Sequence, residues 1–297
     1  MLAAMKTFDG SLVALATPFR NGALDEDAYR AFVRWQLDNG TQGLVPIGTT
    51  GEAVTMTAEE RFRAVRIAAE EAKGRAPVIA GAGSNSTSET IEQVRRAREA
   101  GADAALVVTP YYNKPTQAGL FEHYRLIARA HPGFPLVPYN VPGRTSVDMT
   151  AETVARLCQI AEVVALKEAT ASMIRAIEIV ELCGDRITLL SGDDFTVLPF
   201  LACGGRGVIS VSANVAPRMM SELVRLARAG EIAKAREIQV RMNELHRLLF
   251  IESSPIPVKR ALHLMQKFGP EIRSPLVLMT EANSTRLEAS LRKLGLL

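Results

Sequence analysis

Eight short apolar runs alternate with stretches of helical period along the first two-thirds of the chain, and this alternation limits the possible folds more than any other feature. The runs are residues 11–16, 43–47, 77–80, 104–108, 136–139, 163–167, 187–190 and 207–211. Because they are almost continuously apolar, they are typical of strands buried on both faces of a parallel sheet. Eight strand–helix units within about 215 residues predict an α/β fold of the (β/α)₈ barrel type, whose usual length is about 250 residues.

Helix start signals lie between the apolar runs. Thr57 and Glu60 have the spacing of a capping box, and Ser86 and Glu89 repeat it before the next apolar face. Asp25 has the residue type and position of a third N-cap. Each signal precedes a stretch whose apolar residues recur with helical period, which supports the alternation of strands and helices.

A doubly wound open sheet is the alternative architecture. It normally carries a Gly-x-Gly-x-x-Gly sequence after its first strand, and residues 17–19 read Thr-Pro-Phe instead. The barrel is therefore the better prediction. From about residue 217 onward only helices are expected, at 222–229, 231–250 and 256–268. The predicted organisation is a barrel over residues 1–216 and a C-terminal helical region over residues 217–297.

Composition and charge argue against several classes of protein. The net charge of +3 is small, and no basic cluster is interleaved with aromatic residues, so we expect no nucleic-acid partner. No apolar run approaches the roughly 20 residues that span a bilayer, and residues 1–10 lack the pattern of a signal peptide. The three cysteines are isolated and the four histidines scattered, so no metal site is indicated. We expect a cytoplasmic protein without a membrane partner.

Lys167 ends the apolar run 163–167. In a parallel barrel this position places one amine at the carboxyl end of a buried strand. Burial lowers the pKa of an amine, and the neutral amine is a nucleophile towards ketones. The alternative is a lysine that extends to solvent where its strand ends.

Other polar side chains follow neighbouring strands. Tyr139 ends the strand before Lys167, so its phenol is placed to transfer protons, unless it is a core tyrosine. Thr49 and Thr50 lie in a glycine-framed turn at residues 48–52, which can hold a small carboxylate or can be a plain turn. Arg144, on the loop after Tyr139, can bind a second carboxylate or can be an ordinary surface arginine.

Further strand ends and one loop complete this edge of the barrel. Gly192 follows the seventh apolar run, and Ile209 lies in the eighth. Tyr111 and Tyr112 form a projecting, proline-bounded loop and could serve in an interface or in catalysis. Glu168 follows Lys167 directly and is expected to face away from it, because side chains alternate along a strand.

Together these segments resemble the N-acetylneuraminate lyase and dihydrodipicolinate synthase superfamily of class I aldolase-like enzymes, and within it most closely the dihydrodipicolinate synthases. The resemblance runs in order from Val-Ala-Leu-Ala-Thr-Pro at residues 13–18 to Ile-Pro-Val-Lys at residues 256–259. The residues before Phe8 look like an extension. The family fold is the barrel that the alternation predicts.

The resemblance implies a role for each catalytic residue. Lys167 would form a Schiff base with pyruvate. Tyr139 would give and accept protons, linked through Thr49 to Tyr112. In the family this second tyrosine of the pair reaches into the active site of a neighbouring subunit, and the usual assembly is a homotetramer built as a dimer of dimers.

The resemblance also implies the substrate contacts. Thr50 would hold the pyruvate carboxylate, the Ile209 carbonyl would line the pocket, and Gly192 would belong to the substrate-binding set. Arg144 would bind the carboxylate of L-aspartate 4-semialdehyde. The implied reaction is the condensation of these two substrates in lysine (diaminopimelate) biosynthesis, which needs no metal and no organic cofactor.

Two alternatives remain at this stage. Sialic acid lyases and keto-deoxy sugar acid aldolases share the lysine and the tyrosine but usually differ at the second threonine or the arginine, so Thr49 and Thr50 together with Arg144 favour the synthase. A barrel that only binds a keto acid has no need of a buried amine, which argues against a non-catalytic protein.

Inhibition by lysine is expected to be weak or absent. Three residues of the allosteric cleft that resemblance implies are present, namely Asn85, Glu89 and Tyr111. The Ser and two His residues of lysine-inhibited members are replaced here by Ala53, Ala58 and Arg61.

Overall fold

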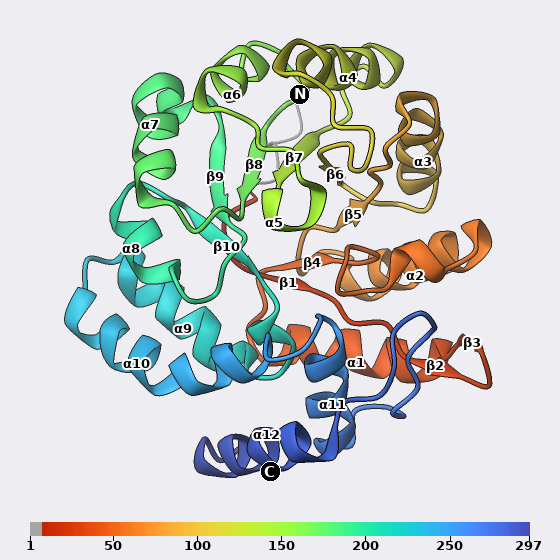
Figure 1. Ribbon diagram of the computed structural model, residues 1–297, viewed down its shortest axis with the longest axis vertical. Helices are drawn as coiled ribbons and strands as arrows, with labels where there is room; N and C mark the ends of the chain where they lie inside the picture. Colours follow the sequence, from red (N-terminus) through yellow and green to blue (C-terminus); the bar gives the residue numbers. More distant parts are fainter. Residues whose placement is uncertain (1–7) are drawn as a thin grey trace.

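Eight parallel strands surrounded by helices form a (β/α)₈ barrel in the computed structural model, which describes residues 8–297 (Figure 1). The strands are β1 (Gly10–Ala14), β4 (Gly43–Val45), β5 (Ile79–Gly81), β6 (Ala104–Val108), β7 (Leu136–Asn140), β8 (Ala165–Glu168), β9 (Thr188–Ser191) and β10 (Gly207–Ser210). Their order in the sheet is β4-β1-β10-β9-β8-β7-β6-β5. The predicted fold class is confirmed, and each of the eight apolar runs overlaps one strand.

The sheet closes between β4 and β5. Leu44 and Val78 form a parallel bridge, and the Leu44 N–H donates to the Pro77 carbonyl at 2.9 Å. Nearer the carboxyl ends, the Gly81 N–H donates to the Pro46 carbonyl at 3.0 Å. The two edge strands therefore pair with each other, as barrel closure requires.

Several predicted strand limits are wrong by one or two residues, for local reasons. The strand predicted at 43–47 ends at Val45, because Pro46 has no N–H to donate and Ile47 has a left-handed φ of 49°. A two-stranded hairpin of β2 (Phe19–Arg20) and β3 (Ala23–Leu24) was not predicted. Its turn is Asn-Gly, a strong signal for a tight hairpin.

Helices cover the outside of the barrel (Figure 1). They are α1 (Glu26–Asp38), α2 (Ala58–Ala72), α3 (Thr87–Glu99), α4 (Gln117–Ala130), α6 (Ala151–Leu157), α7 (Met173–Cys183), α8 (Val197–Ala202) and α9 (Pro217–Arg228). Asp25 caps α1 and Thr57 with Glu60 forms the capping box of α2, as predicted. Ser86 caps α3, but the Glu89 carboxylate accepts from the Ser84 hydroxyl at 2.7 Å instead of completing a second box.

The chain beyond the barrel strands is helical. After α9, which packs against β1, come α10 (Ile232–Leu248), α11 (Ile256–Leu264) and α12 (Glu281–Lys293). In Figure 1 these blue helices lie together on one side of the barrel, next to α1. Helix α12 was not predicted, since it buries only a narrow apolar stripe. The predicted domain limit at residues 216 and 217 stays a prediction.

The apolar core has two layers. The larger lies between the strands and the outer helices. The smaller fills the inside of the barrel with side chains from all eight strands, such as Leu12, Val45 and Val137. Within residues 8–297, no helix combines the length and the apolar character that spanning a bilayer requires.

Asn214 joins the first strand to the turn after the last one. Its amide oxygen accepts from the Ala16 N–H at 2.9 Å, and its amide nitrogen donates to the carbonyls of Ala14 (2.8 Å) and Val211 (2.9 Å). The side chain is fully buried, so these backbone groups have no access to water. A buried donor or acceptor that loses its partner is costly, which makes Asn214 a main contributor to barrel closure.

We therefore expect Asn214→Ala to lower the free energy of unfolding by about 3 kcal/mol, measured by chemical denaturation, because it leaves several buried backbone groups unpaired. Asn113→Ala is the matched control. Asn113 is exposed and makes one bond, to the Asn85 carbonyl at 2.8 Å, so its loss should cost less than about 1 kcal/mol. Equal losses in the two variants would contradict the role of Asn214.

Candidate active site

A cavity of about 680 Å³ opens at the carboxyl ends of the barrel strands. Side chains of the inner core, such as Val45 and Leu106, form part of its lining. Most of the predicted site residues also line it: Lys167, Tyr139, Thr49, Thr50, Arg144 and Gly192. The fold thus brings residues from four different strand–loop segments into one hollow, at the end of the barrel where active sites are found.

Lys167 and Tyr139 are direct partners in the pairing of β7 with β8. The Lys167 amine lies 4.1 Å from the centre of the Tyr139 ring. Both side chains are buried, with 6% of Lys167 and 8% of Tyr139 exposed. The predicted proximity of the amine and the phenol is therefore present in the structure.

Burial lowers the pKa of Lys167 from its ordinary value to about 7. The Asp194 carboxylate acts in the opposite direction, and the Arg144 guanidinium lowers the pKa further. A substantial fraction of the Lys167 amine is therefore neutral near pH 7, whereas an ordinary lysine is fully charged there. The alternative of a lysine that extends to solvent does not fit this buried amine.

Tyr139 keeps its proton over the same pH range. Burial raises the pKa of its phenol to about 12, although the nearby Arg144 charge works against the rise. The site thus combines a weakly basic amine with a protonated phenol. These are the states needed for a nucleophile and for a proton donor beside it.

Gly192 leaves the space that the Lys167 side chain occupies. A Cβ atom at this position would lie 3.1 Å from the Lys167 Cε and 2.6 Å from the Ala169 Cβ. Any side chain there would push against the lysine or the adjacent strand. The glycine is therefore required by close packing and not by an unusual backbone angle.

The turn at residues 48–52 presents its two threonines differently. Thr50 is buried and Thr49 is exposed, and both line the cavity. The N–H of Glu52 donates to the Thr49 carbonyl at 3.1 Å, and the φ of Glu52 is 56°. This tight, left-handed turn places both threonines at the cavity, and hydroxyls and backbone N–H groups of such a turn can hold a small anion.

Arg144 lies at the cavity on the short helix α5 (Pro142–Thr145). Its guanidinium donates to the Ser254 carbonyl at 3.4 Å, and the residue is exposed. Ser254 and Phe250, both from the segment between α10 and α11, also line the cavity and were not predicted. Ile209 is buried inside the barrel and is not among the lining residues, so the role of its carbonyl stays a prediction.

The two adjacent tyrosines, Tyr111 and Tyr112, lie in different surroundings. Tyr111 lines the cavity, whereas Tyr112 is 89% exposed, has a φ of 71° and does not line it. A single chain therefore does not join Tyr112 to Tyr139 through Thr49, and the predicted contribution to a neighbouring subunit stays a prediction. Glu89 lines the far end of the cavity and Asn85 does not. Their predicted allosteric role is likewise untested.

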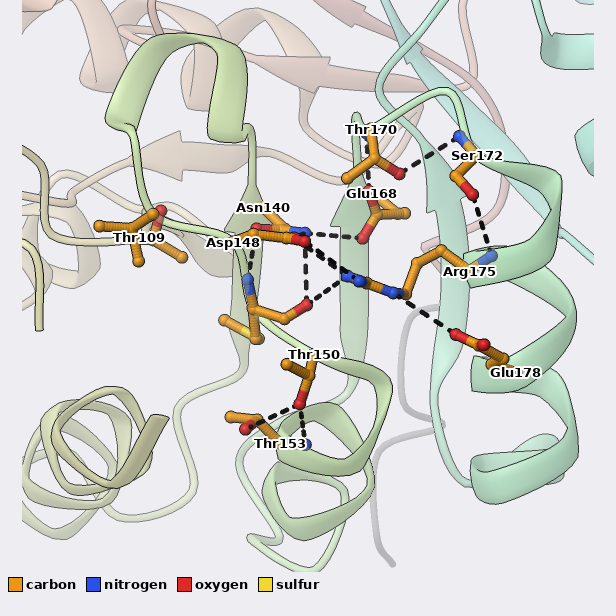
Figure 2. A network of polar contacts seen from close by, with 12 residues as sticks. Thr109, Asn140, Asp148, Thr150, Thr153, Glu168, Thr170, Ser172, Arg175 and Glu178 are labelled. Carbon is orange, nitrogen blue, oxygen red and sulfur yellow. Dashed lines mark hydrogen bonds and ion pairs between the residues drawn. The ribbon is translucent and has the colours of Figure 1, made fainter. Parts of the chain in front are cut away.

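A polar network includes Asn140 and Glu168, the residues that directly follow Tyr139 and Lys167 in the sequence (Figure 2). The Asn140 amide donates to Glu168 at 3.0 Å and to Asp148 at 2.9 Å, and Arg175 pairs with Asp148 at 3.0 Å. Asn140 and Glu168 directly follow Tyr139 and Lys167, so they point to the opposite face of the sheet, as predicted for Glu168. The network fixes the tips of β7 and β8 side by side.

Asp194 is a further residue that the sequence did not single out. Its carboxylate is buried and accepts the N–H groups of Val211 (3.1 Å) and Ser212 (2.9 Å), which joins the segment after β9 to the end of β10. Its charge favours the protonated form of Lys167. The only sequence signal was the Gly-Asp-Asp run after the strand. This run offers two adjacent carboxylates but does not show which of them is buried near Lys167.

The arrangement favours attack of an amine on the carbonyl of a small carboxylate. The cavity brings together the partly neutral Lys167 amine, the Tyr139 phenol, the threonines of the turn at 48–52 and the positive charge of Arg144. Within residues 8–297, no group of three or more His, Cys, Asp or Glu side chains is placed to hold a metal ion.

Comparisons with known proteins agree with this geometry. The Dihydrodipicolinate synthetase family matches residues 7–294. A 4-hydroxy-tetrahydrodipicolinate synthase of Anaeromyxobacter sp. (strain Fw109-5) is 54% identical over 293 residues, which cover 98% of this chain and 99% of that protein. The crystal structure of dihydrodipicolinate synthase from Aquifex aeolicus has a TM-score of 0.95 at 44% identity, covering 97% of this chain and 99% of that one. The chloride-inhibited dihydrodipicolinate synthase from Acinetobacter baumannii, complexed with pyruvate, has a TM-score of 0.96 at 42% identity, covering 98% and 100%.

We expect Lys167 to react with acetic anhydride with a midpoint near pH 7, because burial lowers its pKa to about 7 and only the neutral amine reacts. Peptide mass spectrometry across a pH series measures this midpoint. Lys234 is an internal control, since pairing with Glu231 raises its pKa and delays its labelling to higher pH. The same midpoint for both lysines would contradict the assignment.

Proposed function

The chain belongs to the dihydrodipicolinate synthetase family, and we propose that it condenses pyruvate with L-aspartate 4-semialdehyde to form 4-hydroxy-tetrahydrodipicolinate, a step of lysine (diaminopimelate) biosynthesis. The observation that carries the proposal is the Lys167 amine, buried at the carboxyl end of β8 with a pKa of about 7 and 4.1 Å from the Tyr139 ring centre. A lysine of this kind forms imines with keto acids at neutral pH.

In the first step the neutral Lys167 amine adds to the keto carbon of pyruvate. Loss of water from this adduct gives an imine that links pyruvate to the enzyme, and the oxygen leaves with a proton from Tyr139. Thr50 and its backbone hold the pyruvate carboxylate, which keeps the keto carbon next to the amine. The Ile209 carbonyl and Gly192 complete the pocket.

In the second step the imine loses a proton from the former methyl group and becomes an enamine. The enamine carbon attacks the aldehyde of L-aspartate 4-semialdehyde, whose carboxylate binds Arg144 at the opening of the cavity. The aldehyde oxygen takes up a proton through Tyr139. We propose that Thr49 and the Tyr112 of a neighbouring subunit carry protons between Tyr139 and solvent.

In the last step the amino group of the second substrate attacks the imine carbon. The ring closes and the Lys167 amine leaves, so the enzyme returns to its starting state. The imine accepts the electron pair that the methyl carbon releases on deprotonation, and the resulting enamine donates that pair to the aldehyde carbon, so the reaction as written uses no further cofactor.

We also propose that the chain acts as a cytoplasmic homotetramer built from two tight dimers. The support is Tyr112, which is 89% exposed on a projecting loop and whose proposed role requires a second copy. Weak or absent inhibition by lysine is part of the proposal, because Ala53, Ala58 and Arg61 replace the Ser and His side chains of lysine-inhibited relatives, and Ala53 and Arg61 line the cavity together with Glu89.

Borohydride reduction in the presence of pyruvate should trap a stable adduct on Lys167, because hydride reduces the imine to an amine that cannot hydrolyse. Peptide mass spectrometry locates the adduct. Lys167→Arg keeps a positive charge but offers no nucleophilic amine, so this variant should give none. An adduct on a different lysine would exclude Lys167 as the Schiff-base residue.

Arg144→Ala should raise the KM for L-aspartate 4-semialdehyde about 30-fold, the usual effect of losing a charged hydrogen bond, and change the KM for pyruvate much less. It should also move the lower limb of the pH–rate profile to higher pH, because the Arg144 charge helps to keep the pKa of Lys167 low.

Arg144→Lys is the matched control for the second effect. It keeps the charge near Lys167 but loses the two-pronged contact with a carboxylate, so the KM should rise while the pH profile stays in place. A coupled assay with pyruvate measures both quantities and, run with sugar-acid aldehydes and with lysine, also tests the alternative substrates and the inhibition. Equal increases in both KM values would show that Arg144 is structural.

A further inference from the structure

A buried ion pair joins the turn at residues 48–52 to the C-terminal helices. The Lys259 amine, on α11, lies 2.5 Å from the Glu52 carboxylate, and each side chain is only 2% exposed. The two residues are 207 positions apart in the sequence. The last residue of the turn is therefore held by a segment that contributes nothing to the barrel sheet.

The second oxygen of the Glu52 carboxylate is also occupied. It accepts the backbone N–H of Arg273 at 3.0 Å. The Arg273 guanidinium donates to the Thr55 carbonyl at 2.9 Å and pairs with Glu60 at the start of α2. The short segment from the turn to α2 is thus attached to the C-terminal region at several points, all of which involve charged groups.

Aromatic packing adds to this attachment. The Lys259 amine lies 4.4 Å from the centre of the Phe19 ring, and the Arg273 guanidinium lies 4.0 Å from it. Phe19 itself is buried and belongs to the β2–β3 hairpin. Both cations therefore have a fixed position relative to the start of the barrel.

Stability alone does not account for such an ion pair. Removing two charges from water is costly, and well-packed apolar side chains would often serve the fold equally well. The turn is strained, because Ile47 and Glu52 both have left-handed φ angles (49° and 56°) although neither is a glycine. The ion pair holds this strained turn in a fixed position. Thr49 and Thr50 lie between Ile47 and Glu52 and face the cavity.

We propose that Glu52 and Lys259 are positioning residues, whose ion pair holds the turn at 48–52 so that Thr50 meets the carboxylate of pyruvate. This inference rests on the proposed function, which assigns that carboxylate to Thr50. Glu52 and Lys259 do not line the cavity and do not touch the substrate. They act through the two threonines.

The C-terminal helices therefore form part of the catalytic apparatus. The ion pair fixes the turn that forms one wall of the cavity. Ser254 lies just before α11 and lines another wall, where its carbonyl accepts a hydrogen bond from Arg144. A displacement of α11 would disturb both carboxylate-binding groups at once. The pyruvate affinity reports the effect on the turn alone.

The test compares Lys259→Met, the double variant Glu52→Gln/Lys259→Met, and the wild-type chain. The double variant removes both charges and keeps the side-chain shapes, so it folds even where the single variant leaves Glu52 charged, buried and unpaired. Both variants should raise the KM for pyruvate about tenfold with a smaller change in kcat, because the turn no longer holds Thr50 in place. Lys293→Met is the matched control, since its pair with Glu244 is exposed, and it should leave the KM unchanged.

A double-mutant cycle with Thr50→Val separates positioning from general stability. If Lys259 acts through Thr50, the loss of pyruvate affinity in Thr50→Val/Lys259→Met should be clearly smaller than the two single losses combined. Additive losses, or a lowered melting temperature with an unchanged KM for pyruvate, overturn the inference. A wild-type chain that forms no borohydride-trapped pyruvate adduct overturns the proposed function and this inference together, whereas normal KM values in the variants of an active enzyme overturn this inference alone.

Discussion

The removal of the Lys167 amine from water is the interaction on which the site depends. The barrel buries this side chain at the end of β8, and the loss of hydration brings its pKa from the ordinary value to about 7. Two charges act on the same amine in opposite directions, Asp194 raising its pKa and Arg144 lowering it. Burial is the largest of the three effects, so the closed sheet itself generates the reactivity and the neighbouring charges adjust it.

The parallel register of β7 and β8 then determines which side chain lies next to the Lys167 amine. Tyr139 and Lys167 are paired residues on adjacent strands, and the residues that follow them, Asn140 and Glu168, bond to each other on the opposite face (Figure 2). One face of these two strand tips therefore lines the cavity, and the other carries a structural network. A slip of one residue would exchange the two faces, so the network of Asn140 and Glu168 protects the geometry of the amine and the phenol.

The sequence predicted most of the fold and the central pair, because both depend on local patterns. Continuous apolar runs mark the eight strands, and a lysine and a tyrosine at successive strand ends must become neighbours in a barrel. The sequence did not predict the network around Arg175, whose partners are brought together only by the folded loops. It also could not place Tyr112, since the orientation of an exposed loop side chain depends on what covers it in an assembly.

The Glu52–Lys259 pair shows why such contacts are not visible in a sequence. The Gly-Thr-Thr-Gly-Glu pattern indicates a turn, but nothing local tells that its last carboxylate is buried or that its partner lies 207 residues away. A buried carboxylate must be paired, and the structure supplies a lysine from α11 and a backbone N–H from Arg273. The barrel therefore provides the amine and the phenol, whereas the C-terminal region holds the turn at residues 48–52. Because these two contributions come from different parts of the chain, the proposed role of Thr50 predicts that changes in α11 alter pyruvate binding without altering the pKa of Lys167.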